Sequence, residues 1–180
     1  MRPGRFSLFG VLLCCGSWAA GVAALEEAPQ PVTAELIAGH ASVQPGGKTR
    51  VGIYFNIEPG WHIYAQDPGD AGLPTKAIWT SLLPSGAYIE TPPQWPPAQT
   101  FIDPGDIHTF GYSGTLLLAA TLNTMAQISV TEISVTAHVE WLACREICLP
   151  GKADLELMLP VSTTPPALSP HAKLFASTNP

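Results

Sequence analysis

One uninterrupted alternation of apolar and polar residues decides the fold, and it reads Ile133-Ser134-Val135-Thr136-Ala137-His138-Val139-Glu140-Trp141. Successive side chains of a strand point to opposite faces, so this pattern predicts a strand with one face in a core and one toward solvent. Residues 51–57 and 155–159 alternate in the same way, residues 61–65 continue the pattern, and residues 116–122 form a more continuous apolar run. We therefore expect strands rather than helices.

Turn-forming residues separate these runs. Pro, Gly and Asp cluster at residues 45–47, 67–70, 84–86 and 103–106. Residues 91–97 hold two Pro-Pro pairs and cannot form a central strand, because proline has no N–H to donate to the ladder. The 19 prolines and 16 glycines also argue against long helices. About eight short strands separated by turns indicate an all-β protein, an antiparallel β-sandwich.

The ends of the chain differ from the middle. Residues 1–24 have the parts of a secretory signal peptide: Arg2 and Arg5, an apolar stretch over residues 6–20, and small residues before a cleavage site at Leu25. An uncleaved anchor is the alternative, although the apolar stretch is shorter than the roughly 20 residues of a good span. We expect a linker at residues 25–31 and the sandwich domain at residues 32–161.

Residues 162–180 form a tail rich in Ser, Thr and Pro, which we expect to be loosely ordered apart from a short helical turn near Lys173. The charge balance limits the partners. Outside the leader, six Lys/Arg face fourteen Asp/Glu, with no basic cluster. This acidic surface argues against nucleic acid or anionic lipid as a partner.

Chemistry is concentrated in a single pair of cysteines. Cys14 and Cys15 lie in the leader, so only Cys144 and Cys148 remain after cleavage, in a compartment where disulfides persist. A disulfide closing a loop of about five residues contributes roughly 2 kcal/mol in the chain-entropy model, against about 4.7 kcal/mol for a 100-residue loop. Because so short a loop stabilises the fold only slightly, the pair is better suited to a redox function than to a structural one. A staple would be marked by a reduction potential below about −300 mV.

The local conformation of the pair is open at this stage. Cys144 ends one predicted strand and Cys148 begins the next segment, so a tight connection would place them opposite each other in a hairpin, whereas a helical turn would also bring them close. A metal site is the competing chemistry, with Cu(I) or Zn held by both thiolates and His138 or Met158. Zinc normally takes four ligands and the histidines are scattered, so we expect no metal and no cofactor.

Three motifs carry a resemblance to a known family. They are Gly60-Trp61-His62-Ile63-Tyr64 with the following Asp67-Pro68-Gly69-Asp70-Ala71-Gly72-Leu73-Pro74-Thr75, then Phe110-Gly111-Tyr112-Ser113-Gly114, then Trp141-Leu142-Ala143-Cys144 through Cys148-Leu149-Pro150-Gly151. Together they resemble the periplasmic N-terminal domain of the thiol:disulfide interchange protein DsbD, and more closely its ScsB-like branch. The resemblance spans roughly residues 32–160. The spacing of the cysteines is shorter than in the best-known members.

The resemblance implies an immunoglobulin-like sandwich in the periplasm that acts as a protein-disulfide reductase component. In that family the domain takes electrons from a membrane domain through a thioredoxin-like domain, and passes them to disulfide isomerases and cytochrome c maturation factors. By the same resemblance, Cys148 forms the intermolecular disulfide, Cys144 resolves it, and Phe110 or Tyr112 caps the pair. The membrane and thioredoxin-like domains are not among these 180 residues, so three expectations stay open: a separate protein donates the electrons, the domain has been repurposed, or the sequence is one portion of a longer system. A copper-binding or copper-tolerance module using the same cysteines is the alternative function.

Overall fold

The computed structural model describes residues 30–83, 86–90, 93–103 and 105–177. The predicted signal peptide lies outside these ranges, as do residues 25–29 of the predicted linker. The described residues form ten strands and one short 3-10 helix: β1 Val32–Ala38, β2 Lys48–Ile57, β3 His62–Gly69, β4 Lys76–Leu83, β5 Ala87–Ile89, β6 Gln99–Asp103, β7 Ile107–Tyr112, β8 Thr115–Thr124, β9 Glu132–Cys144, β10 Cys148–Pro160 and η1 Ala172–Ser177.

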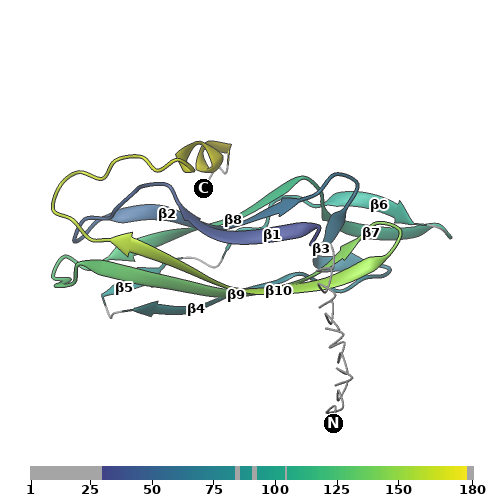
Figure 1. The fold of residues 1–180 in the computed structure, drawn as a ribbon, viewed down its shortest axis with the longest axis horizontal. Helices are drawn as coiled ribbons and strands as arrows, with labels where there is room; N and C mark the ends of the chain where they lie inside the picture. Colours follow the sequence, from purple (N-terminus) through teal and green to yellow (C-terminus); the bar gives the residue numbers. More distant parts are fainter. Residues whose placement is uncertain (1–29, 84–85, 91–92, 104, 178–180) are drawn as a thin grey trace, which may run out of the picture.

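The strands form two antiparallel sheets packed face to face, which confirms the predicted all-β, immunoglobulin-like sandwich (Figure 1). One sheet has the order β1-β2-β8-β5. The other has the order β10-β9-β3-β7-β6, and β4 pairs with the part of β9 that β3 leaves free. The turn between β9 and β10 lies at the same end of the molecule as β6 and β7 (Figure 1).

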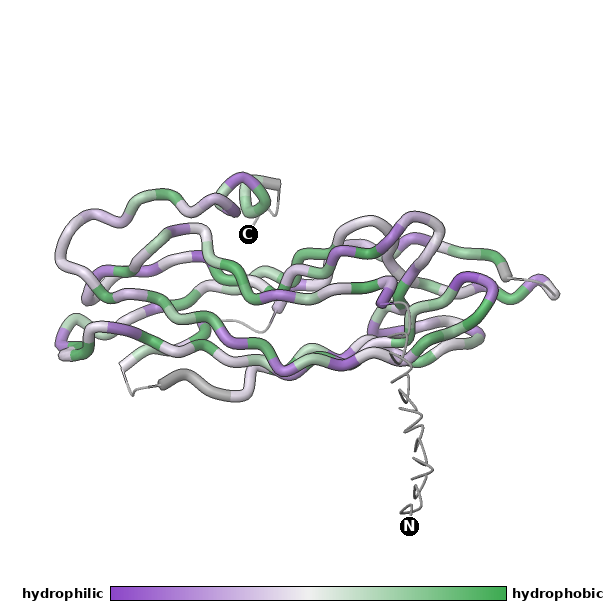
Figure 2. The backbone as a smooth tube through the Cα atoms, viewed as in Figure 1, coloured by the Kyte–Doolittle hydropathy of each residue, from purple (hydrophilic) through white to green (hydrophobic). Residues whose placement is uncertain are grey.

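The core forms where the alternating patterns of the two sheets meet. Ile133, Val135, Ala137 and Val139 of β9 are buried, while Ser134, Thr136 and His138, which alternate with them, are only partly buried. Phe55 and Leu118 enter the same core from the facing sheet. Figure 2 shows the corresponding changes of hydropathy along the strands. Each such side chain stabilises the fold by about 1.5–3 kcal/mol, so the alternation is enough to bring the sheets together.

One expected turn lies inside a strand instead. Residues 67–69 belong to β3, which continues to Gly69 through a shift in register opposite β7. Gly69 has a φ of 82° and its N–H donates to Asp67 Oδ1 at 3.1 Å. The turn formers therefore produce an irregularity within a strand, because β7 supplies a partner that the local sequence does not reveal.

Residues 162–177 of the tail pack against the sandwich, so for this part of the tail the expectation of loose order is wrong. The N–H of Ala41 donates to the carbonyl of Ala167 at 2.9 Å, and the N–H of Ser169 donates to that of Gly39 at 3.1 Å. Phe175 of η1 is 7% exposed and packs on the outer side of the four-stranded sheet with Ile37 and Ala119. The helical turn near Lys173 is confirmed. In the part of the chain that the structure describes, no helix has the length and apolarity needed to cross a membrane.

Candidate functional site

Cys144 and Cys148 form a disulfide at the tip of the β9–β10 hairpin. They are the first directly paired residues of the ladder, with Cα atoms 4.1 Å apart. The loop holds three residues, and the N–H of Arg145 donates to the carbonyl of Ile147 at 3.0 Å. Of the two local conformations that the spacing allowed, the hairpin is therefore the one present.

The two cysteines differ in exposure. Cys144 is 3% exposed, whereas Cys148 is exposed and adjoins Ile147, an apolar residue that is 59% exposed. A reagent or protein approaching the hairpin therefore reaches the sulfur of Cys148 first. This difference is the basis for assigning separate chemical roles to the two residues.

An aromatic group adjoins the buried cysteine. His62 of β3 pairs directly with Cys144, so both side chains lie on the same face of the sheet. The His62 ring stacks on Phe101 of β6 with centroids 4.4 Å apart, and it meets Tyr64 edge to face at 5.3 Å. His62 is 8% exposed. The sequence placed His62 inside a motif, but only the pairing of β3 with β9 places it at the cysteines.

Of the two predicted cap residues, Tyr112 lies in the core. Tyr112 is 5% exposed in the main core, and its hydroxyl donates to the carbonyl of Pro96 at 2.8 Å. It pairs with Ile63, which also pairs with Ala143, so its side chain lies on the core face rather than on the face of Cys144. Burial raises the pKa of the Tyr112 hydroxyl. The structure thus places Tyr112 in the core.

Phe110 also packs against this core, with its ring close to Gly69. A Cβ built at Gly69 would lie 3.2 Å from that ring. Strand pairing places His62 next to Cys144, and the His62 ring stacks on Phe101; neither residue was predicted as a cap. Shielding by Phe110 therefore stays a prediction, and any such effect would pass through the packing of β3 against β7.

Charged side chains line the outer face of β4, β9 and β10. Lys76 Nζ donates to Glu140 Oε2 at 3.0 Å, while His138 contacts Asp154 at 2.6 Å and Glu140 at 3.4 Å. The hydrogen bond to Asp154, and then that to Glu140, raises the pKa of His138. The hydrogen bond from Lys76, and then that from His138, lowers the pKa of Glu140. These side chains therefore pair with one another through hydrogen bonds and opposite charges on the sheet surface.

The structure does not bring the proposed metal ligands to the cysteines. His138 pairs with Asp154 several residues away from the hairpin tip, and Met158 lies at the opposite end of β10 from Cys148. Arg145, in the loop, holds its guanidinium 5.1 Å from the centre of the Trp61 ring. Among the described residues, no three His, Cys, Asp or Glu side chains form a group suited to a metal ion.

An immunoglobulin-like sandwich with one solvent-accessible disulfide at a hairpin tip defines the class: a β-domain that supports thiol–disulfide exchange. The family model for the N-terminal region of the thiol:disulfide interchange protein DsbD matches residues 29–160. The chain belongs to this family, which confirms the resemblance noted in the sequence.

Two solved structures are similar. The N-terminal periplasmic domain of ScsB from Proteus mirabilis is 17% identical with a TM-score of 0.52, over 83% of this chain and 53% of that one. This chain therefore spans about half the length of the ScsB structure. The reduced N-terminal domain of DsbD from Neisseria meningitidis is 12% identical with a TM-score of 0.35, over 71% of this chain and 83% of that one. No curated protein sequence matches the chain.

Proposed function

We propose that the protein is a periplasmic dithiol carrier that takes electrons from a thioredoxin-like or membrane-bound donor and passes them to partner proteins through Cys144 and Cys148. The unequal exposure of the two cysteine residues, in a chain of the DsbD N-terminal family, carries this proposal. The partners that suit it are periplasmic thioredoxin-like proteins and disulfide isomerases. The predicted signal peptide supports the location.

The proposed reaction consists of two exchanges. The thiolate of Cys148 attacks one sulfur of the partner's disulfide, a mixed disulfide forms, and the partner's other sulfur leaves as a thiolate. The thiolate of Cys144 then attacks the sulfur of Cys148 and the partner's second thiolate departs. The carrier loses two electrons and two protons, and the partner gains both. Reduction of the carrier by its donor is the reverse sequence.

His62 has a proposed part in the second exchange. Burial raises the pKa of a thiol, so Cys144 needs a nearby group to accept its proton before it attacks. His62 is the titratable residue paired directly with it, and an imidazole changes charge near neutral pH. We assign His62 as this proton acceptor, held in place by its stacking on Phe101.

Trapping of the mixed disulfide tests the proposal. The protein with Cys144→Ala, expressed with its leader, retains the exposed sulfur but cannot resolve the intermediate. We expect it to accumulate adducts that dithiothreitol dissolves and whose partners, identified by mass spectrometry, carry a reactive cysteine pair. Cys148→Ala is the matched control and should form few adducts. Equal trapping by both variants, or none by either, would contradict the assigned roles.

A further inference from the structure

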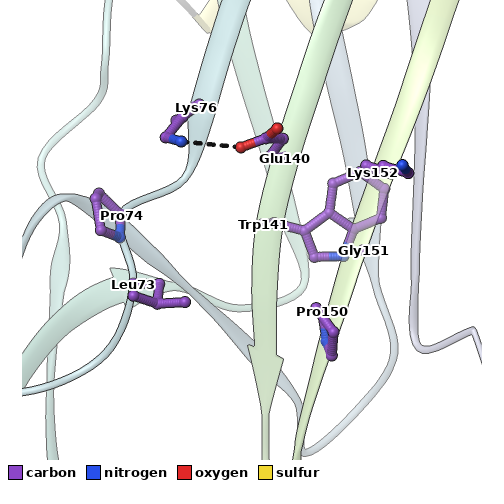
Figure 3. Close-up of a pocket in the computed structure, with 8 residues that line it drawn as sticks. All are labelled: Leu73, Pro74, Lys76, Glu140, Trp141, Pro150, Gly151 and Lys152. Atoms are coloured by element: carbon purple, nitrogen blue, oxygen red, sulfur yellow. Dashed lines mark hydrogen bonds and ion pairs between the residues drawn. The ribbon is translucent and has the colours of Figure 1, made fainter.

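A pocket of about 400 Å³ lies over β9 and β10 (Figure 3), and one of its lining residues, Pro150, is two positions from Cys148. It extends from the β3–β4 connection across β9 to β10. Figure 3 shows the Lys76–Glu140 ion pair toward one end and Leu73 and Pro150 toward the other. The residues that line it are Leu73, Pro74, Lys76, Glu140, Trp141, Pro150, Gly151 and Lys152.

Apolar groups form most of this pocket although it is open to solvent. Leu73 is 62% exposed, and the exposed residue Pro150 lines the same pocket. Trp141 pairs with Gly151, and a Cβ at position 151 would lie 2.3 Å from the indole. The Trp141 ring can lie over β10 only because position 151 is a glycine. Exposed apolar surface that surrounds a concave site is typical of binding surfaces.

A partner protein in a mixed disulfide with Cys148 can reach the pocket. Residues 148, 150 and 152 alternate along β10, so Pro150 and Lys152 share the face of the disulfide. Pro150 is two residues from Cys148, a distance of about 7 Å along a strand. A protein bonded to Cys148 through its own cysteine therefore places its flanking residues, at about 3.3 Å each, over this pocket.

The charge at the pocket differs from that of the chain as a whole. The chain has a net charge of −6 and only eight Lys/Arg, yet two of these, Lys76 and Lys152, line the pocket. Glu140 is engaged by Lys76 at 3.0 Å. The pocket therefore favours an acidic group at the rim near Lys152, beside an apolar group within.

We propose that this pocket selects the redox partner by binding a segment next to the partner's reacting cysteine, with an apolar side chain two or three residues from that cysteine and a carboxylate facing Lys152. The inference rests on the proposed function, because the mixed disulfide at Cys148 supplies the anchor. It adds a recognition site that is separate from the two sulfurs.

Model peptides can test this on the purified, reduced protein. Each peptide carries one cysteine as a mixed disulfide with thionitrobenzoate, and a leucine or a serine placed two or three residues before or after it. The residue after that leucine or serine is either aspartate or asparagine, so that the effect of a carboxylate is measured separately. The thiolate of Cys148 attacks the peptide sulfur, and thionitrobenzoate leaves as the better leaving group and is measured by its colour. We expect the best leucine peptide to react roughly tenfold faster than its serine counterpart.

Variants locate the effect. Leu73→Ser should bring the leucine-to-serine ratio close to one, and Lys152→Glu should remove the preference for aspartate over asparagine. Ile78→Ser and Lys48→Glu are matched controls, because Ile78 is an exposed apolar residue of β4 outside the pocket and Lys48 is an exposed lysine of the other sheet. Neither control should change the ratios.

Two failures are distinguishable. Equal rates for leucine and serine peptides, or an unchanged ratio in Leu73→Ser, would overturn the pocket proposal while leaving the carrier function intact. A reduced, folded protein that reacts neither with any peptide nor with dithiobis(nitrobenzoate), the symmetrical disulfide of thionitrobenzoate, would overturn both the pocket proposal and the carrier function.

Discussion

Reduction of the Cys144–Cys148 disulfide should leave the domain folded, as a carrier requires. The bond closes a loop of about five residues, so its loss should lower the free energy of unfolding by about 2 kcal/mol in the chain-entropy model. The hairpin does not depend on the bond alone, because β9 and β10 remain paired from Cys144 and Cys148 to Glu132 and Pro160. For a domain of this size, that loss corresponds to a decrease of about 4–8 °C in Tm.

Thermal unfolding followed by circular dichroism, with and without dithiothreitol, measures this decrease. The double variant Cys144→Ala/Cys148→Ala is the control, and its Tm should not respond to the reductant. A reduced protein that has lost its sheet signal at 25 °C would refute the reasoning, because the disulfide would then be a structural staple. A decrease far above 8 °C would show that the bond stabilises more than its own loop.

Three further outcomes follow from the site. Tyr112→Phe removes the hydrogen bond to Pro96 and should lower the free energy of unfolding by about 1 kcal/mol, whereas Tyr112→Ala should lower it by about 3–5 kcal/mol. Urea unfolding measures both, and an unchanged stability in the alanine variant would place the ring outside the core. The raised pKa of His138 means that its ion pair with Asp154 stabilises the fold fully below the ordinary histidine pKa and is lost as the pH rises through the raised value. Nuclear magnetic resonance titration should accordingly show a lower midpoint for His138 in Asp154→Asn, and an equal midpoint would count against the pair. His62→Phe keeps an aromatic ring to stack on Phe101 but cannot accept a proton. In this variant the resolution of a preformed mixed disulfide should slow roughly tenfold or more near pH 7 and recover at high pH. An unchanged pH profile would show that His62 is not the proton acceptor.

The sequence predicted those features that depend on neighbouring residues. The alternation at residues 133–141 identified β9, and the placement of Cys144 and Cys148 around a three-residue connection allowed the hairpin. Both signals are local, since a period of two needs no knowledge of the partner strand. The family resemblance rested on three local motifs, and the family model confirms the family over residues 29–160.

Features that depend on distant strands were not predictable in this way. His62 reaches Cys144 only because β3 pairs with β9, and Phe101 reaches His62 only because β7 joins β6 to β3. The order of the tail likewise depends on Phe175 meeting Ile37, far away in sequence. A composition rich in Ser, Thr and Pro predicts disorder only when nothing else buries the apolar residues within it.

The different exposure of the two cysteines has a structural origin in the order of the strands. β9 has neighbours on both sides at its end, β10 and β3, so Cys144 is enclosed and 3% exposed. β10 is an edge strand, so Cys148 has a neighbour on one side only and is exposed. An exposed edge invites unwanted strand pairing, which prolines and lysines oppose, and β10 carries Pro150 and Lys152 next to its cysteine. A partner that cannot extend the sheet there must instead be recognised through side chains, and the pocket lined by Leu73, Pro150 and Lys152 offers a surface for that contact.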